Sequence, residues 1–114
     1  MTPYPAATRS PLIVALDTAD RDDLQRLAAT VAPHAGMLKI GLEAYTALGG
    51  EAVAVAGRHA PVFLDLKVHD IPATAAGAAR AASRLGAAML TVHASGGPAM
   101  VAAAVEAAPQ VTVL

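Results

Sequence analysis

The sequence has no cysteine and no tryptophan, and aromatic residues make up only 3% of its 114 residues. Without cysteine, a disulfide scaffold, a cysteine-ligated zinc site and a thiolate nucleophile are excluded, and a cytoplasmic location is favoured. An excess of charge is missing too, since eight basic and nine acidic residues give a net charge of -1. We therefore expect no binding to nucleic acid or to a membrane surface, and a small-molecule ligand instead.

Long hydrophobic runs are also absent. No apolar stretch approaches the roughly 18 residues that span a bilayer, and residues 1–10 lack the apolar segment of a signal peptide. We expect neither membrane insertion nor export. Apolar residues make up 55% of the chain, which is typical of a globular domain.

Five short apolar runs are candidate β-strands. They cover residues 12–16, 37–40, 62–66, 89–92 and 111–114. Ala-rich segments with helical periodicity lie between them, and the predicted helices cover residues 20–33, 42–59 with a break at Gly49-Gly50, 72–86, and 98 onward. This alternation predicts successive βα units around a parallel sheet, and hence an α/β fold.

Polar residues follow these strands at their carboxyl ends. Asp17 follows the first strand, Lys39 lies near the end of the second, Asp65 and Lys67 close the third, and His93 follows the fourth. The carboxyl ends of parallel strands share one edge, where open α/β sheets and (β/α)8 barrels place their active sites. The sequence therefore predicts a site at this edge.

Asp65 and Lys67 form the richest part of this predicted site. Alternation along a strand places the two side chains on the same side, and Lys39 arrives from the neighbouring strand. Neighbouring carboxylates favour the charged form of Lys67, which makes it a better proton donor than Schiff-base nucleophile. A buried ion-pair network that only closes the end of a barrel is the structural alternative.

The block DLKVHDIPAT, residues 65–74, resembles the signature of the orotidine 5'-phosphate decarboxylase family, Asp-x-Lys-x-x-Asp-Ile-Pro/Gly-x-Thr. Its fixed positions are met at Asp65, Lys67, Asp70, Ile71, Pro72 and Thr74. The segments VALD, LKIG and TVHASGG agree with the same family, and the resemblance runs from residue 11 to residue 114. It implies a (β/α)8 barrel, of which this chain holds about four βα units and the start of strand five.

The resemblance also implies an activity, the decarboxylation of orotidine 5'-monophosphate to UMP in pyrimidine biosynthesis, without metal or organic cofactor. Loss of CO2 leaves a carbanion at C6 in the plane of the pyrimidine ring, and a fixed cation must stabilise it. By this resemblance Lys67 supplies that cation and protonates C6, while Asp65 orients Lys67. A preorganised charge array of this kind often gives the largest catalytic contribution.

The remaining site residues are likewise assigned by resemblance. Asp17 and Lys39 bind the ribose hydroxyls, and Ile71 packs near the ring. Asp70 and Thr74 reach the substrate of the other subunit in a homodimer, where Asp70 completes the charge array. Asp17 has a simpler alternative as a cap or turn residue. We expect His93 to be structural, with direct contact to the substrate as the alternative, and His69, His34 and His59 to lie at the surface.

The chain departs from the family in its length. A complete barrel needs about 200 residues or more, and the family's phosphate-binding residues belong to later βα units. We therefore interpret residues 1–10 as an N-terminal extension and residues 11–114 as the N-terminal half of a truncated barrel domain. In isolation the chain is expected to be inactive or nearly so.

Two rival interpretations remain. Sugar-phosphate decarboxylases of the same superfamily share an Asp-x-Lys-x-x-Asp pattern and use it with magnesium, although Ile71, Pro72 and Thr74 favour the orotidine enzyme. The second rival is a non-catalytic half-barrel fragment.

Overall fold

The strands of this protein form a single parallel sheet in a computed structural model that describes residues 10–114. They are β1 (Ile13–Ala15), β2 (Met37–Ile40), β3 (Val62–Val68), β4 (Met89–Val92) and β5 (Thr112–Val113). The sheet order is β1-β2-β3-β4-β5, and every neighbouring pair is parallel. The predicted α/β fold is thus confirmed, and each strand overlaps a predicted run, although β3 extends two residues beyond the run predicted at 62–66. Residues 1–9 of the predicted extension lie outside the described residues.

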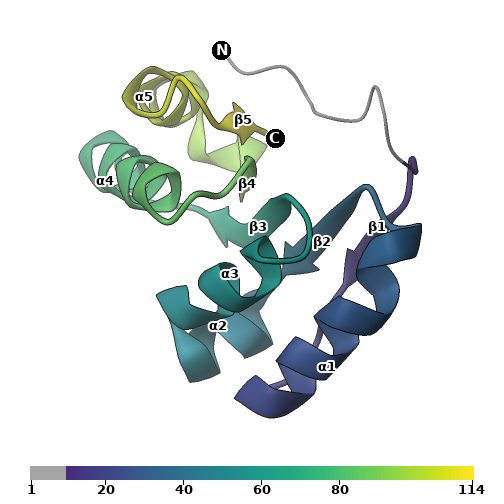
Figure 1. Ribbon diagram of the computed structural model, residues 1–114. Coiled ribbons are helices and arrows are strands. Elements are labelled where there is room, and N and C mark those ends of the chain that lie inside the picture. Colours follow the sequence, from purple (N-terminus) through teal and green to yellow (C-terminus); the bar gives the residue numbers. More distant parts are fainter. Residues whose placement is uncertain (1–9) are drawn as a thin grey trace.

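A helical segment follows each of the first four strands. The helices are α1 (Arg21–Val31), α2 (Leu42–Leu48), α3 (Gly50–Gly57), α4 (Pro72–Arg84) and α5 (Pro98–Ala107), with short 3-10 turns at η2 (Ala32–His34) and η3 (Ala94–Gly96). Figure 1 shows them following one another along one face of the sheet, from α1 at the lower right to α5 at the upper left. The other face of the sheet carries no helix among the described residues.

Local sequence explains where two of these helices begin and end. Asp20 caps α1, because its Oδ1 accepts the backbone N–H of Asp23 at 2.8 Å. Gly49 has a φ of +61°, which an L side chain rarely adopts, and it separates α2 from α3. The predicted break in the second helix is confirmed at this residue.

Small side chains fill the core between the helices and the sheet. On α1, Leu24 and Ala28 are fully buried, whereas Leu27 and Val31 are only half-buried. Leu24 and Ala28, four residues apart, therefore face the core, and Leu27 and Val31 lie at its flank. This packing fixes each βα unit and brings the carboxyl ends of the strands to one edge.

None of the helices described for residues 10–114 combines the length and apolar character needed to cross a membrane.

Candidate active site

A cluster of charged side chains occupies the carboxyl edge of β2 and β3. At its centre is Asp65, which is 7% exposed and is the single buried charged residue in the described part of the chain. Its Oδ2 accepts hydrogen bonds from Lys67 Nζ at 3.0 Å and from Lys39 Nζ at 3.1 Å. Lys39 and Lys67 are the only two lysines in the sequence. Both place their ammonium groups on the same oxygen.

The other carboxylate oxygen of Asp65 is held by β4. The hydroxyl of Thr91 donates to Asp65 Oδ1 at 2.7 Å, and the same hydroxyl accepts the backbone N–H of Lys67 at 2.9 Å. Asp65 therefore receives three donors from three different strands, β2, β3 and β4. A carboxylate with this many partners is fixed in both position and rotation.

Lys67 has an unusual backbone conformation for a strand residue. Its φ is +52°, the one positive value at a non-glycine residue among residues 10–114. The pairing of β3 with β4 shifts register between Leu64 and Val68. We predicted a regular alternation that would place Asp65 and Lys67 on one side. Their side chains do meet, but through an irregular backbone that turns Lys67 back towards Asp65.

The cluster carries a net positive charge, because two ammonium groups share one carboxylate. The Lys67 side chain is 56% exposed and that of Lys39 is 26% exposed, so solvent or a ligand can reach both from the open side. A fixed cation beside an ion pair is suited to an anionic substrate or to negative charge that develops during a reaction. The cluster can therefore bind an anion and supply a proton from Nζ.

Asp65 is strongly biased towards its ionised form. Burial alone would raise its pKa, but hydrogen bonds from Thr91, Lys67 and Lys39 outweigh burial and lower the pKa from 3.8 to about 2. The carboxylate thus keeps its charge at any pH well above 2. Both lysines then retain their counter-ion.

This lowered pKa leads to a prediction about stability. A carboxyl group with a depressed pKa in the folded state stabilises the fold above its unfolded pKa, and this contribution is lost as pH falls through the folded pKa. We expect Asp65→Asn to reduce the free energy of unfolding by on the order of 2 kcal/mol at pH 6. The difference from the unmodified chain should shrink between about pH 4 and about pH 2.

Urea unfolding of both proteins across that pH range measures the effect. Asp22→Asn is a suitable control, since the Asp22 side chain is 95% exposed on α1. A difference at Asp65 that stayed constant from pH 6 to pH 2 would contradict the assignment.

The structure does not bring the other predicted site residues into this ion-pair cluster. Asp17 is exposed after β1, and its Oδ1 lies 3.7 Å from the position that a Cβ on Gly41 would occupy. Asp70 and Thr74 are exposed, and Ile71 is 65% exposed. Among residues 10–114, Asp65 is the only carboxylate paired with either lysine.

The loop between β3 and α4 presents Asp70 and Ile71 outward. Oδ1 of Asp70 accepts the backbone N–H of Ile71 at 2.7 Å, and the backbone N–H of Asp70 lies 3.4 Å from Met100 Sδ on α5. These contacts hold the loop against α5 while the Ile71 side chain remains open to solvent. An exposed large apolar residue beside an exposed carboxylate is available to another molecule.

The four histidines occupy different settings. His69 and His93 are exposed, and their rings pack together with centroids 5.1 Å apart. His34 is exposed as expected. The expectation for His59 is wrong: it is half-buried, and its Nε2 is buried without a hydrogen-bond partner in the described part of the chain. Its backbone N–H donates to the carbonyl oxygen of Ala56 at 3.0 Å, so the backbone at His59 continues the turn that follows α3.

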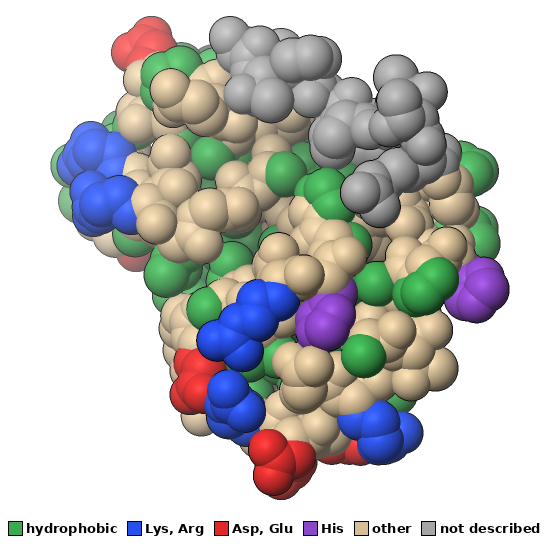
Figure 2. All heavy atoms as spheres, in the orientation of Figure 1, with side chains coloured by type: hydrophobic (Ala, Val, Ile, Leu, Met, Phe, Trp, Pro, Cys, Tyr) green, Lys and Arg blue, Asp and Glu red, His purple; other side chains and the backbone are tan. Residues whose placement is uncertain are grey.

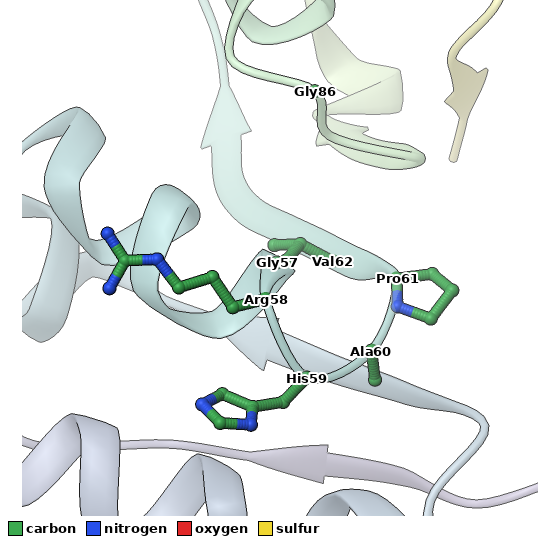
Figure 3. Close-up of a pocket in the computed structure, with 7 residues that line it drawn as sticks. All are labelled: Gly57, Arg58, His59, Ala60, Pro61, Val62 and Gly86. Carbon is green, nitrogen blue, oxygen red and sulfur yellow. The ribbon is translucent and has the colours of Figure 1, made fainter.

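A surface hollow of about 410 Å³ lies at the opposite end of the strands. It is lined by Gly57, Arg58, His59, Ala60, Pro61, Val62 and Gly86. Figure 3 shows that residues 57–62 of this lining come from the turn into β3, with the Arg58 side chain directed away from Pro61, and that Gly86 lies on the separate segment that follows α4. The hollow contains none of the predicted site residues.

Charged groups are dispersed over the face of the molecule seen in Figure 2. Basic side chains lie over α4 and over the lower part of the molecule, separated by apolar and backbone surface and interspersed with acidic groups. No group of three or more His, Asp or Glu side chains that could hold a metal ion occurs in residues 10–114. The charged cluster around Asp65 is therefore the strongest candidate site in the described structure.

Sequence reasoning missed Thr91 as part of this cluster. The signal available was a hydroxyl residue inside the apolar run MLTV, near the carboxyl end of a strand. The positive φ of Lys67 left no comparable signal in the sequence, because it follows from how β3 pairs with β4.

Comparison with known proteins points to one family. The family model for "Orotidine 5'-phosphate decarboxylase / HUMPS family" matches residues 10–113. An orotidine 5'-phosphate decarboxylase of Thermobifida fusca is 57% identical over 89% of this chain and 44% of its own length. One from Frankia casuarinae is 50% identical over 96% of this chain and 47% of its own length. The chain thus spans about half the length of these curated relatives.

A solved structure has the same arrangement of strands and helices. The orotidine 5'-monophosphate decarboxylase of Methanocaldococcus jannaschii, complexed with inhibitor BMP, superposes with a TM-score of 0.82 at 28% identity. The match covers 90% of this chain and 48% of that one. The predicted fold, the N-terminal portion of a (β/α)8 barrel, is confirmed by this likeness. With the family model matching nearly its whole length, the chain belongs to the orotidine 5'-phosphate decarboxylase / HUMPS family.

Proposed function

We propose that this chain supplies the charged part of an active site that decarboxylates orotidine 5'-monophosphate to UMP. The observation that carries the proposal is the pairing of Lys67 and Lys39 with the same oxygen of Asp65, at 3.0 and 3.1 Å. Curated relatives that match the chain are named for this activity, and a related structure is titled as a complex with inhibitor BMP.

The reaction requires the geometry that surrounds Lys67. When the bond between C6 and the carboxylate breaks, its electron pair stays on C6 and CO2 leaves. In this proposal the Lys67 ammonium stabilises this pair and then transfers a proton from Nζ to C6. Lys67 becomes neutral and regains a proton from solvent, to which its side chain is open. The attraction between the Lys67 ammonium and the charge on C6 depends on how much water surrounds them. Two unit charges about 4 Å apart interact by about 4 kcal/mol at an effective dielectric near 20, against about 1 kcal/mol in water.

Asp65 keeps Lys67 in place for this transfer. Its carboxylate is buried, ionised and held by Thr91, so the ammonium does not have to reorganise as charge develops on C6. Lys39, bound to the same oxygen, adds a second positive charge and, with Asp17, binds the ribose hydroxyls. Ile71 packs near the pyrimidine ring. The proposed reaction uses no metal or organic cofactor.

The active protein in this proposal is a homodimer with shared sites, located in the cytoplasm. Asp70 and Thr74 of one subunit reach the substrate bound by the other. Their exposure, and that of Ile71 beside them, supports this arrangement. Residues 11–114 form the N-terminal half of the barrel domain, and the phosphate group is bound by residues outside them.

The test joins this chain to the segment of the Thermobifida fusca relative that follows the matched region, giving what we call the joined protein. We expect the joined protein to convert orotidine 5'-monophosphate to UMP, and the 114-residue chain alone to show no substantial turnover. The reason is that binding energy from a remote phosphate is used to drive the chemical step. A folded joined protein without activity, in an assay where the relative is active, would contradict the proposal.

A chelator distinguishes the proposed activity from the rival, magnesium-dependent one. If activity on a sugar phosphate appeared and was lost on adding EDTA, the magnesium-dependent decarboxylase would replace our proposal. We expect activity on orotidine 5'-monophosphate to be unchanged by EDTA.

A further inference from the structure

The segment of β3 that carries the charged cluster is longer than the strand it faces. Leu64 pairs with Leu90 and Val68 pairs with Val92. Between these pairs β3 contains Asp65, Leu66 and Lys67, whereas β4 contains only Thr91. Such a bulge leaves extra residues without regular ladder partners and re-aims their side chains. Thr91 is therefore the one β4 residue that stands opposite the irregular segment.

Thr91 contacts this segment through a single hydroxyl. The hydroxyl donates a hydrogen bond to Asp65 Oδ1 at 2.7 Å and accepts one from the backbone N–H of Lys67 at 2.9 Å. Because an ionised carboxylate only accepts hydrogen bonds, the direction of the first bond is fixed, and the hydroxyl is then free to accept the second. Thr91 thus connects the carboxylate of one charged residue to the backbone of the other.

The backbone contact matters because Lys67 is in a conformation that costs energy. Left-handed backbone at a residue with a Cβ is unfavourable, and it persists only where surrounding contacts hold it. The N–H of Lys67 would have no ladder partner at this point of the bulge without Thr91. On the other side, the N–H of His93 bonds to the carbonyl oxygen of Val68 at 2.9 Å and closes the bulge.

The side-chain contact determines which oxygen faces the lysines. With Oδ1 bound to Thr91, Oδ2 is left to accept both Lys39 and Lys67. Without the hydroxyl, the Asp65 carboxylate could rotate about its terminal bond and present either oxygen. The two ammonium groups would then lose their common anchor.

We propose that Thr91 is a positioning residue, whose hydroxyl sets the rotation of the Asp65 carboxylate and the left-handed backbone of Lys67 and thereby aims the Lys67 ammonium. This inference rests on the proposed decarboxylation for its catalytic consequence. The positioning itself is a property of the chain and can be measured without any reaction.

The first experiment measures positioning in the 114-residue chain. The titration of the Asp65 carboxyl carbon is followed by NMR in the unmodified chain, in Thr91→Val and in Thr91→Ser. We expect the midpoint for Asp65 to rise in Thr91→Val, because one of three stabilising donors is lost, and to stay near its original value in Thr91→Ser. An unchanged midpoint in Thr91→Val would overturn the proposal.

The second experiment measures catalysis in the joined protein. We expect Thr91→Val to lower kcat by about 10- to 100-fold, because a small misplacement of a reacting group costs up to about 100-fold, with little change in KM. Thr91→Ser should restore most of kcat. If Thr91→Ser were as slow as Thr91→Val, or if Thr91→Val changed KM alone, positioning by the hydroxyl would be refuted.

Thr112→Val is the matched control. Thr112 is a half-buried residue on the adjacent strand β5, and its hydroxyl has no hydrogen bond within the described residues. It should change neither the Asp65 midpoint nor kcat. Thr91→Ala replaces Thr91→Val in both experiments if the valine variant does not fold. A shifted Asp65 midpoint together with an inactive unmodified joined protein would refute the decarboxylase assignment while leaving the positioning role intact.

Discussion

Lys67→Ala in the joined protein is expected to reduce the rate of decarboxylation by at least about 10⁴-fold, since general acid catalysis contributes roughly 10²–10⁴ and fixed electrostatic stabilisation about 10²–10³. Both contributions come from one ammonium group, which the structure holds 3.0 Å from Asp65. Measurement of kcat and KM over a range of substrate concentrations separates this loss from a loss of binding.

The fold should survive this substitution. Lys67 is 56% exposed, and removing its side chain opens no cavity in the core. Circular dichroism of the variant is expected to match that of the unmodified protein. Urea unfolding should show a smaller loss of stability than Asp65→Asn, because Asp65 keeps its bonds to Lys39 and Thr91. Arg84→Ala, which removes an exposed cation at the end of α4, is the control and should retain full activity. Residual activity of Lys67→Ala within tenfold of the unmodified protein would rule out Lys67 as the proton donor.

Asp70→Ala is expected to cost a comparable part of the activity, but through the neighbouring subunit. If sites are shared, a dimer of one Lys67→Ala subunit and one Asp70→Ala subunit contains one site with both residues intact. Random mixing of the two inactive variants should then recover about a quarter of the unmodified activity, because half of the dimers are mixed and each has one complete site.

A second mixture provides the control for this experiment. Lys67 and Asp65 are in direct contact within one subunit, so each site takes both residues from the same chain. Mixing Lys67→Ala with Asp65→Ala should therefore recover no activity. Equal recovery in both mixtures, or no recovery in either, would contradict the placement of Asp70 across the dimer.

Much of the fold could be predicted from local patterns. The five strands, the break at Gly49 and the cap at Asp20 all depend on short-range rules of periodicity, backbone freedom and capping. The meeting of Lys39 with Asp65 could be predicted from strand-end placement, because a parallel sheet brings the carboxyl ends of neighbouring strands together.

The features that escaped prediction depend on pairing between distant segments. The left-handed backbone of Lys67 arises because β3 and β4 differ in length between two paired positions. Thr91 enters the cluster because it stands opposite that bulge. His59 was expected at the surface because it follows the end of a helix, but it is half-buried just beyond α3 and its Nε2 is enclosed.

The most direct test of the central claim is a crystal structure of the joined protein with UMP, the product of the proposed reaction. We expect Lys67 Nζ to be the side-chain nitrogen nearest to C6, within about 3.5 Å, while remaining bonded to Asp65. A structure with UMP bound elsewhere, or with Lys67 turned into solvent away from Asp65 and Lys39, would contradict it.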